Sequence, residues 1–196
     1  MLSLSHPLIM DLGEEKELVR QAQKAPDAFA ELYDQYYPKI FGYILRRTAN
    51  LETAQDLTSE TFFNALNKLW QFRWRNISFS SWLYKIASNQ INQHFRKIKY
   101  KKSMSLEELQ EQGFEPVSSD NPESELLEAQ EKLRQHREFR EVQDKIVRLP
   151  AKYQEVIALR FFEQKQIKEI SEILGKKEGT VKSLLHRAVE KLREAD

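Results

Sequence analysis

The chain has 196 residues, a formal net charge of +1 and no cysteine. This length predicts one or two small domains, and the absence of cysteine excludes disulfides, thiolate catalysis and the common structural zinc sites. No apolar run approaches the length of a membrane span, and residues 1–10 make a poor signal peptide. We therefore expect a cytoplasmic protein that does not insert into a membrane.

Long stretches with helical spacing and only five glycines predict an all-α fold. We expect a first helix over residues 14–24 and a second that begins near Asp27, a suitable N-cap. Pro38 fits the first turn of a third helix, and Asn50 fits the N-cap of a fourth. A loop over residues 71–78 then leads into a fifth helix.

The predicted fourth helix carries an acidic patch. Asp56 and Glu60 are four residues apart, which places them on one helical face, beside Leu57 and Phe63. An acidic and partly apolar surface is repelled by DNA and suits a basic protein surface. Acidic helix faces are usually only solvated, and this segment alone leaves that alternative open.

Residues 70–102 combine aromatic and basic side chains. All three tryptophans lie here, and the eight Lys and Arg residues are accompanied by no Asp or Glu. Aromatic rings stack on unpaired bases and cations neutralise phosphates, so this mixture suits single-stranded DNA. The side-chain amides that can read base edges are those of Asn76, Asn89, Asn92 and Gln93.

A core function is the alternative for part of this segment, because Phe79, Trp82 and Ile86 are also spaced like a buried stripe. We expect Trp82 to be mostly buried for this reason. The loop residues have no such periodicity and are better functional candidates: Arg73, Trp74, Arg75 and Asn76.

An acidic segment follows, because residues 103–131 contain nine Asp and Glu residues and no Lys or Arg. The content of Ser, Glu, Gln, Gly and Pro predicts a solvated linker. The expected architecture is two small helical domains, residues 14–102 and 138–196, joined by an acidic flexible linker over residues 103–137.

The last third of the chain has the pattern of a basic helix-turn-helix. One apolar helical face ends at Leu174, and Gly175 follows where a left-handed C-cap requires a residue without Cβ. A second helix begins near Glu178, with an apolar stripe opposite a polar, basic face. This geometry enters a DNA major groove. An ordinary helical hairpin with solvated lysines is the alternative that the segment leaves open.

Four motifs follow one another along the chain. They are Phe29-x-x-Leu32-Tyr33-x-x-Tyr36-Tyr37, Asp56-Leu57-x-x-Glu60-Thr61-Phe62, Phe79-x-x-Trp82-Leu83-Tyr84-x-Ile86-Ala87-x-Asn89, and Leu149-Pro150 continuing through Gly179-Thr180-Val181-Lys182-Ser183 to Leu185-His186-Arg187-Ala188. In order and spacing they resemble bacterial RNA polymerase sigma factors of the small extracytoplasmic-function (ECF) group. The resemblance covers most of residues 27–100 and 138–195.

The resemblance implies a factor without catalytic residues, metal or cofactor, whose partners are core RNA polymerase and promoter DNA, both duplex and melted. It leaves an anti-sigma protein open as a further partner. Core polymerase would contact Asp56, Leu57, Glu60, Phe63 and Asn64. The N-terminal domain would read and melt the minus-ten element through Arg73, Trp74, Arg75, Asn76, Ser78, Lys85, Asn89, Asn92, Gln93, Arg96 and Lys97. The helix-turn-helix would read the minus-thirty-five element through Lys176, Lys177, Gly179, Thr180, Lys182, Ser183, His186 and Arg187.

The chain departs from the family pattern at a few positions. Lys177 stands where the family usually has a serine cap, so we expect the recognition helix to lack its usual N-cap. Leu184 and Val189 occupy positions that are often Arg, which makes the DNA face less basic, and Gln93 stands where Asp is common. These changes affect the expected promoter preference and leave the class unchanged.

Two other function classes compete with this interpretation. An enzyme is disfavoured because the four histidines lack metal-ligand spacing and no glycine-rich phosphate loop is present. The nearer alternative is a dimeric helix-turn-helix repressor or activator, in which the first domain serves for ligand sensing or dimerisation. Such a protein needs no aromatic and basic segment for strand separation.

Overall fold

The computed structural model describes residues 12–74, 77–104 and 144–194, and every regular element in these ranges is helical. The N-terminal elements are α1 (Leu12–Ala22), the 3-10 turn η1 (Pro26–Ala28), α2 (Phe29–Thr48), α3 (Leu51–Lys68), the 3-10 turn η2 (Leu69–Gln71) and α4 (Phe79–Met104). The C-terminal elements are a helical stretch at residues 144–148, α6 (Ala151–Ile157), η3 (Ala158–Phe162), α7 (Ile167–Leu174) and α8 (Glu178–Arg193). The all-α prediction is confirmed. The expected linker lies outside the described residues, apart from its first two, which end α4.

Two expected N-caps have different outcomes. Asn50 caps α3 as predicted, because its side chain accepts a hydrogen bond of 2.7 Å from the backbone N of Thr53. Asp27 does not cap α2. It lies inside η1, where Pro26 has already set a helical turn, and α2 begins after Ala28, whose side chain cannot accept a hydrogen bond.

The predicted helix break at Pro38 is wrong, because α2 is one continuous helix of 20 residues that contains Pro38. Pro38 removes one backbone hydrogen bond to the carbonyl of Asp34, but both residues are exposed, so water can solvate that carbonyl. Buried side chains on both sides of the proline stabilise the helix across it, among them Leu32, Tyr36 and Ile40.

The helix-turn-helix forms as predicted. α7 ends at Gly175, whose φ of 62° is the left-handed conformation that favours glycine. At its start, Gln166 and Glu169 form a capping box. α8 then begins at Glu178 and buries Val181 and Ala188 against α6 and α7.

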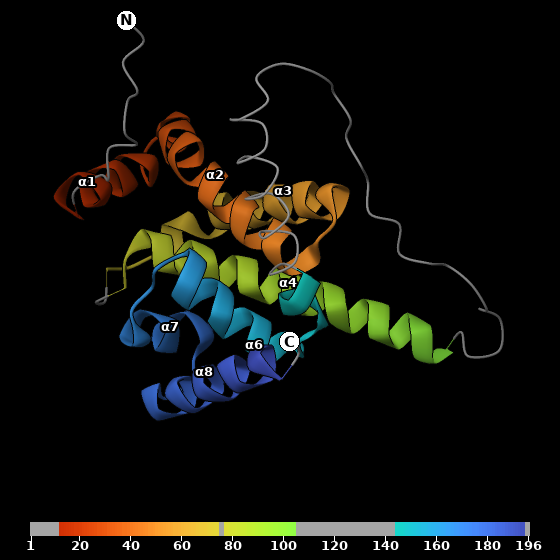
Figure 1. Cartoon of the computed structure of the whole chain (residues 1–196). Helices are drawn as coiled ribbons and strands as arrows, with labels where there is room; N and C mark the ends of the chain where they lie inside the picture. The colour runs from red at the N-terminus through yellow and green to blue at the C-terminus, as the bar shows by residue number, and fades with distance from the viewer. Residues whose placement is uncertain (1–11, 75–76, 105–143, 195–196) are drawn as a thin grey trace, which may run out of the picture.

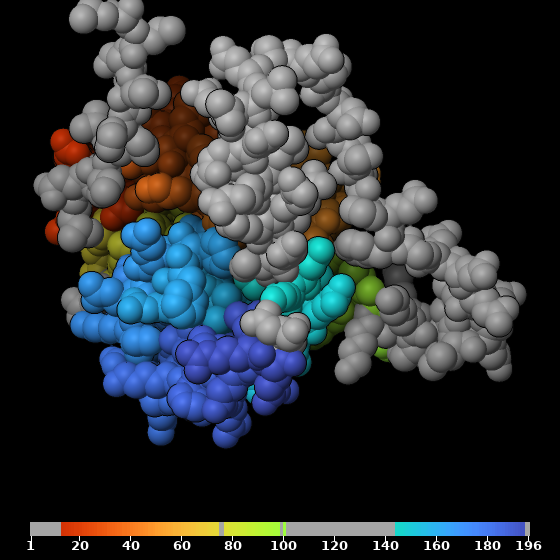
Figure 2. Space-filling model, viewed as in Figure 1, coloured from red at the N-terminus to blue at the C-terminus, as the bar shows by residue number. Residues whose placement is uncertain are grey.

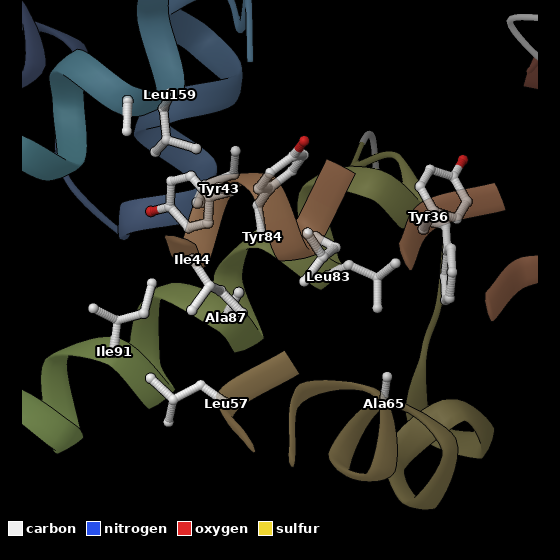
Figure 3. Close-up of a cluster of buried hydrophobic side chains, with 14 of the residues drawn as sticks. Tyr36, Tyr43, Ile44, Leu57, Ala65, Leu83, Tyr84, Ala87, Ile91 and Leu159 are labelled. Carbon is white, nitrogen blue, oxygen red and sulfur yellow. The ribbon is translucent and has the colours of Figure 1, made fainter. Parts of the chain in front are cut away.

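The two halves of the described chain pack into one body (Figure 1). A single cluster of buried side chains contains residues from both halves, from Leu18 in α1 to Ala188 in α8. Figure 3 shows Leu159, from the C-terminal part, beside Tyr43 of α2. In Figure 2 the blue C-terminal part lies directly against the N-terminal part. Among the elements, α7 packs on α4. The α4 helix is therefore shared between both halves.

Candidate functional site

The outer face of α3 is acidic at one end and apolar at the other. Asp56 and Glu60 are exposed, Phe63 one turn further along α3 is 66% exposed, and Trp70 in the following turn η2 is 65% exposed. Phe63 is a helical neighbour of Glu60, and Trp70 extends the exposed aromatic surface past the end of α3. We call Asp56, Glu60, Phe63 and Trp70 the α3 patch.

Two of the residues expected to contact polymerase are not on the exposed surface of the α3 patch. Leu57 is buried in the core at 6% exposure, so the α3 patch is formed without it. Asn64 is half-buried, and its side chain donates a 2.8 Å hydrogen bond to the Glu60 carbonyl of its own helix. The exposed aromatic ring of Trp70 was not expected in this patch, although its seven-residue spacing from Phe63 could have indicated it.

The loop after η2 is anchored by Phe72. The Phe72 ring is buried, and the half-buried Trp74 ring packs edge-on against it with centroids 5.4 Å apart. Arg73 is exposed and donates hydrogen bonds to the backbone carbonyls of Trp70 and Phe72. Arg75 and Asn76, also expected to contact the minus-ten element, lie outside the described residues.

One face of α4 presents polar and basic side chains to solvent. Lys85, Asn89, Gln93 and Lys97 follow one another at four-residue spacing and are all exposed. Asn89, Gln93, Arg96, Lys97 and Tyr100 line one open hollow on this face. Ser78 instead caps α4, since its Oγ accepts from the backbone N of Ser81 at 3.1 Å.

Asn92 lies apart from this face. It is half-buried between the two halves of the molecule, where its Oδ1 accepts from Arg47 and its Nδ2 donates 3.0 Å to Glu155. As a candidate base reader, Asn92 is therefore engaged within the protein in this conformation.

The exposed face of α8 contains Lys182, Ser183, His186 and Arg187. His186 lies 3.2 Å from Glu190 on the next turn. Gly179 and Thr180 are exposed in the first turn, Lys177 precedes it as an N-cap with no side-chain hydrogen bond, and Lys176 is half-buried. The expectation that this helix lacks its usual cap is confirmed.

Sequence reasoning missed a set of charged residues between the two halves: Arg46, Arg47, Glu155 and Glu163. Burial raises the pKa of the nearby Tyr43, and burial followed by the Glu163 carboxylate raises the pKa of Tyr84. The one available signal was Glu155, a carboxylate directly before the apolar run of residues 156–159.

The described residues contain no group of three His, Asp or Glu side chains that could hold a metal ion. None of the helices described is long and apolar enough to cross a bilayer.

Comparisons with known proteins agree with this arrangement. The family model Sigma-70 region 2 matches residues 32–100, and the model Sigma-70, region 4 matches residues 139–192. The chain is 38% identical to RNA polymerase sigma factor YlaC of Bacillus subtilis, over 84% of this chain and 90% of YlaC. It is 33% identical to ECF RNA polymerase sigma factor SigW of Bacillus subtilis, over 91% of this chain and 94% of SigW. The chain belongs to the ECF RNA polymerase sigma factors.

The sigma factor is also 34% identical to ECF RNA polymerase sigma factor BldN of Streptomyces coelicolor, and it spans 93% of its own length and 66% of BldN. Two solved structures share its fold. CnrH in complex with the cytosolic domain of CnrY superposes with a TM-score of 0.65 at 19% identity, covering 94% of this chain and 97% of that chain. The sigma factor RpoE in complex with the anti-sigma factor NepR, from Bartonella quintana, gives 0.63 at 20% identity, covering 85% and 94%.

As a sigma factor, the protein directs promoter-specific transcription initiation by RNA polymerase. Region 2 contains most of α2, with α3 and most of α4, and region 4 contains α6, η3, α7 and α8. A dimeric helix-turn-helix repressor would need no region 2, so the comparisons decide against that alternative.

Proposed function

We propose that the α3 patch docks this sigma factor on a basic surface of core RNA polymerase, and that two separate basic faces read the promoter. The observation that carries the proposal is the separation of these surfaces. Asp56 and Glu60 lie on α3 with the exposed Phe63, and Trp70 follows in η2, whereas the exposed cations of α4 and α8 lie on other helices. Like charge would repel the α3 patch from DNA, and opposite charge would attract it to a basic protein surface.

Charge reversal of the α3 patch tests the docking role. Asp56→Arg together with Glu60→Arg should abolish binding to core polymerase while the helical content stays native, because both side chains are exposed and neither stabilises the core. The matched control is Glu172→Arg with Glu194→Arg, which makes the same change in net charge in the C-terminal half of the chain. Unchanged affinity of the Asp56 and Glu60 variant for core polymerase would contradict the assignment.

We assign the minus-ten element to the loop around Trp74 and the exposed face of α4, and the minus-thirty-five element to the exposed face of α8. A half-buried tryptophan beside an exposed arginine suits capture of an unstacked base. Trp74→Ala should therefore spare binding of closed duplex and impair opening. A pre-melted bubble should restore part of the activity, as read by permanganate footprinting of thymines. Equal loss of closed binding in Trp74→Ala and Arg187→Ala, with no recovery on the bubble, would contradict this division.

In this role the chain performs no covalent chemistry, since core polymerase supplies catalysis, and it works in the cytoplasm where the polymerase acts. An anti-sigma protein is a candidate partner, because RpoE, which shares the fold, was crystallised with the anti-sigma factor NepR. Affinity purification of the tagged chain from its host cells, with the co-purified proteins identified by mass spectrometry, tests both partnerships.

A further inference from the structure

The Glu155 carboxylate of region 4 is buried against α2 and α4 of region 2. The side chain of Arg47, at the end of α2, is fully buried, and its Nη1 lies 3.5 Å from the Glu155 carboxylate of α6. Asn92 of α4 completes the group, since it accepts from Arg47 at 3.1 Å and donates to Glu155 at 3.0 Å. Removing a charge from water costs free energy, so a charged side chain is fully buried only where an ion-pair or hydrogen-bond partner offsets that cost.

A second carboxylate makes a similar contact a few residues later. Arg46 and the Tyr84 hydroxyl both donate to Glu163, whose side chain is 5% exposed. The Arg46 guanidinium also lies 5.1 Å from the centroid of the Phe162 ring. Glu163 follows directly on η3, a single π-helical turn in which its backbone N bonds to the carbonyl of Ala158. This irregular turn directs Phe162 and Glu163 toward region 2.

Further contacts extend the same interface. The Lys165 ammonium donates to Ser80 Oγ at 2.8 Å, at the start of α4, and lies 5.2 Å from the centroid of the Tyr84 ring. Leu159, fully buried, packs with the apolar residues of α2 and α4 (Figure 3). The interface therefore joins an apolar centre to two ion-paired carboxylates, which is the composition of a specific contact.

This arrangement cannot engage a whole promoter. The centres of the minus-ten and minus-thirty-five elements lie about 25 base pairs apart, which is about 85 Å at 3.4 Å per base pair. A compact body of this size has a radius of gyration of about 15 Å, and hence a diameter of roughly 40 Å. Region 4 must leave region 2 before α4 and α8 can reach both elements, and the same movement frees Asn92 from Glu155.

We propose that the described conformation is a closed, autoinhibited state of the free sigma factor, latched by the carboxylates of Glu155 and Glu163 on Arg47 and Arg46 of region 2. The inhibitory role rests on the proposed function of α4 and α8 as promoter readers, whereas the latch itself rests on the interface alone. Core polymerase binds the open state and pulls the equilibrium toward it.

Fluorescence energy transfer measures the latch directly. The chain has no cysteine, so Glu31→Cys on α2 and Lys191→Cys on α8, both exposed, give two defined dye positions. The latch variant is Glu155→Gln with Glu163→Gln, which keeps side-chain size and one acceptor oxygen on each residue and removes both charges. The control is Glu172→Gln with Glu194→Gln, the same change elsewhere in the C-terminal half of the chain. The latch variant should lose transfer efficiency at low salt and the control should not. Equal transfer in both would overturn the latch.

Binding to core polymerase tests the inhibition. The latch variant should bind with an apparent Kd about tenfold lower than the wild type, because a larger fraction is open before binding. Reduced transfer without a change in Kd would overturn autoinhibition and leave the proposed function intact. If core polymerase binds none of the proteins, the proposed function fails and the inhibitory role with it, while the transfer result still decides the latch. Glu163→Gln alone, opposite the partly exposed Arg46, replaces the double variant if circular dichroism shows that the latter is misfolded.

Discussion

Replacing Glu155 with Ala should destabilise the closed protein by about 3–5 kcal/mol, because the change leaves the charge of Arg47 buried without its ion-pair partner. The remaining acceptors of Arg47 are neutral: Asn92 Oδ1 at 3.1 Å and the Tyr43 hydroxyl at 3.3 Å. Its Nε already has no hydrogen-bond partner. The loss of stability in this variant has an upper limit. If it exceeds the free energy that holds regions 2 and 4 together, the two regions separate and water solvates Arg47.

Urea unfolding followed by circular dichroism measures this loss. In Glu155→Ala the first transition should move to lower urea and have a smaller m-value, because separated domains unfold independently and each exposes less surface. The matched control is Arg47→Leu with Glu155→Leu. It removes both charges together and should recover most of the loss, since apolar replacement of a buried pair is often neutral. A loss under about 1 kcal/mol for Glu155→Ala, which is ordinary for an unexceptional substitution, would refute the reasoning.

Lys177→Ser should raise the thermal midpoint in calorimetry, because Lys177 caps α8 without a side-chain hydrogen bond and a serine N-cap contributes about 1 kcal/mol; an unchanged midpoint would argue against this. Arg187→Ala should weaken binding of holoenzyme to closed promoter duplex by about 1–3 kcal/mol in anisotropy titrations, provided that the exposed guanidinium makes a bidentate base contact. Burial raises the pKa of Tyr43 and Tyr84, so the folded chain holds these protons more tightly than the unfolded chain. The contribution of these two protonated hydroxyls to the free energy of unfolding is therefore complete below the unfolded tyrosine pKa of about 10 and falls as the pH rises above it. A urea midpoint that does not change as the pH is raised above about 10 would contradict the burial of these hydroxyls.

Local signals in the sequence predicted most of the elements. The helix-turn-helix was predictable because its apolar spacing, Gly175 and the start at Glu178 all depend on residues close together in the chain. Asn50 was predictable for the same reason. Pro38 was misjudged because burial along α2, a property of the whole fold, outweighs the loss of one exposed backbone hydrogen bond.

The candidate sites were only partly predictable. The exposure of Phe63 and the burial of Leu57 could not be distinguished in sequence, since both are apolar residues on one helix. The contacts of Arg47 with Glu155 join residues more than one hundred positions apart, and no local pattern encodes such a pair. The promoter-reading roles of the α4 and α8 faces stay predictions until the variants above are measured.

Run-off transcription with purified core polymerase on fragments of the source genome tests the central claim most directly. The account predicts transcripts of defined length only when this chain is added to core enzyme, and none with the Asp56→Arg, Glu60→Arg variant. No chain-dependent transcript, together with binding of the chain as a homodimer to palindromic duplex, would contradict it.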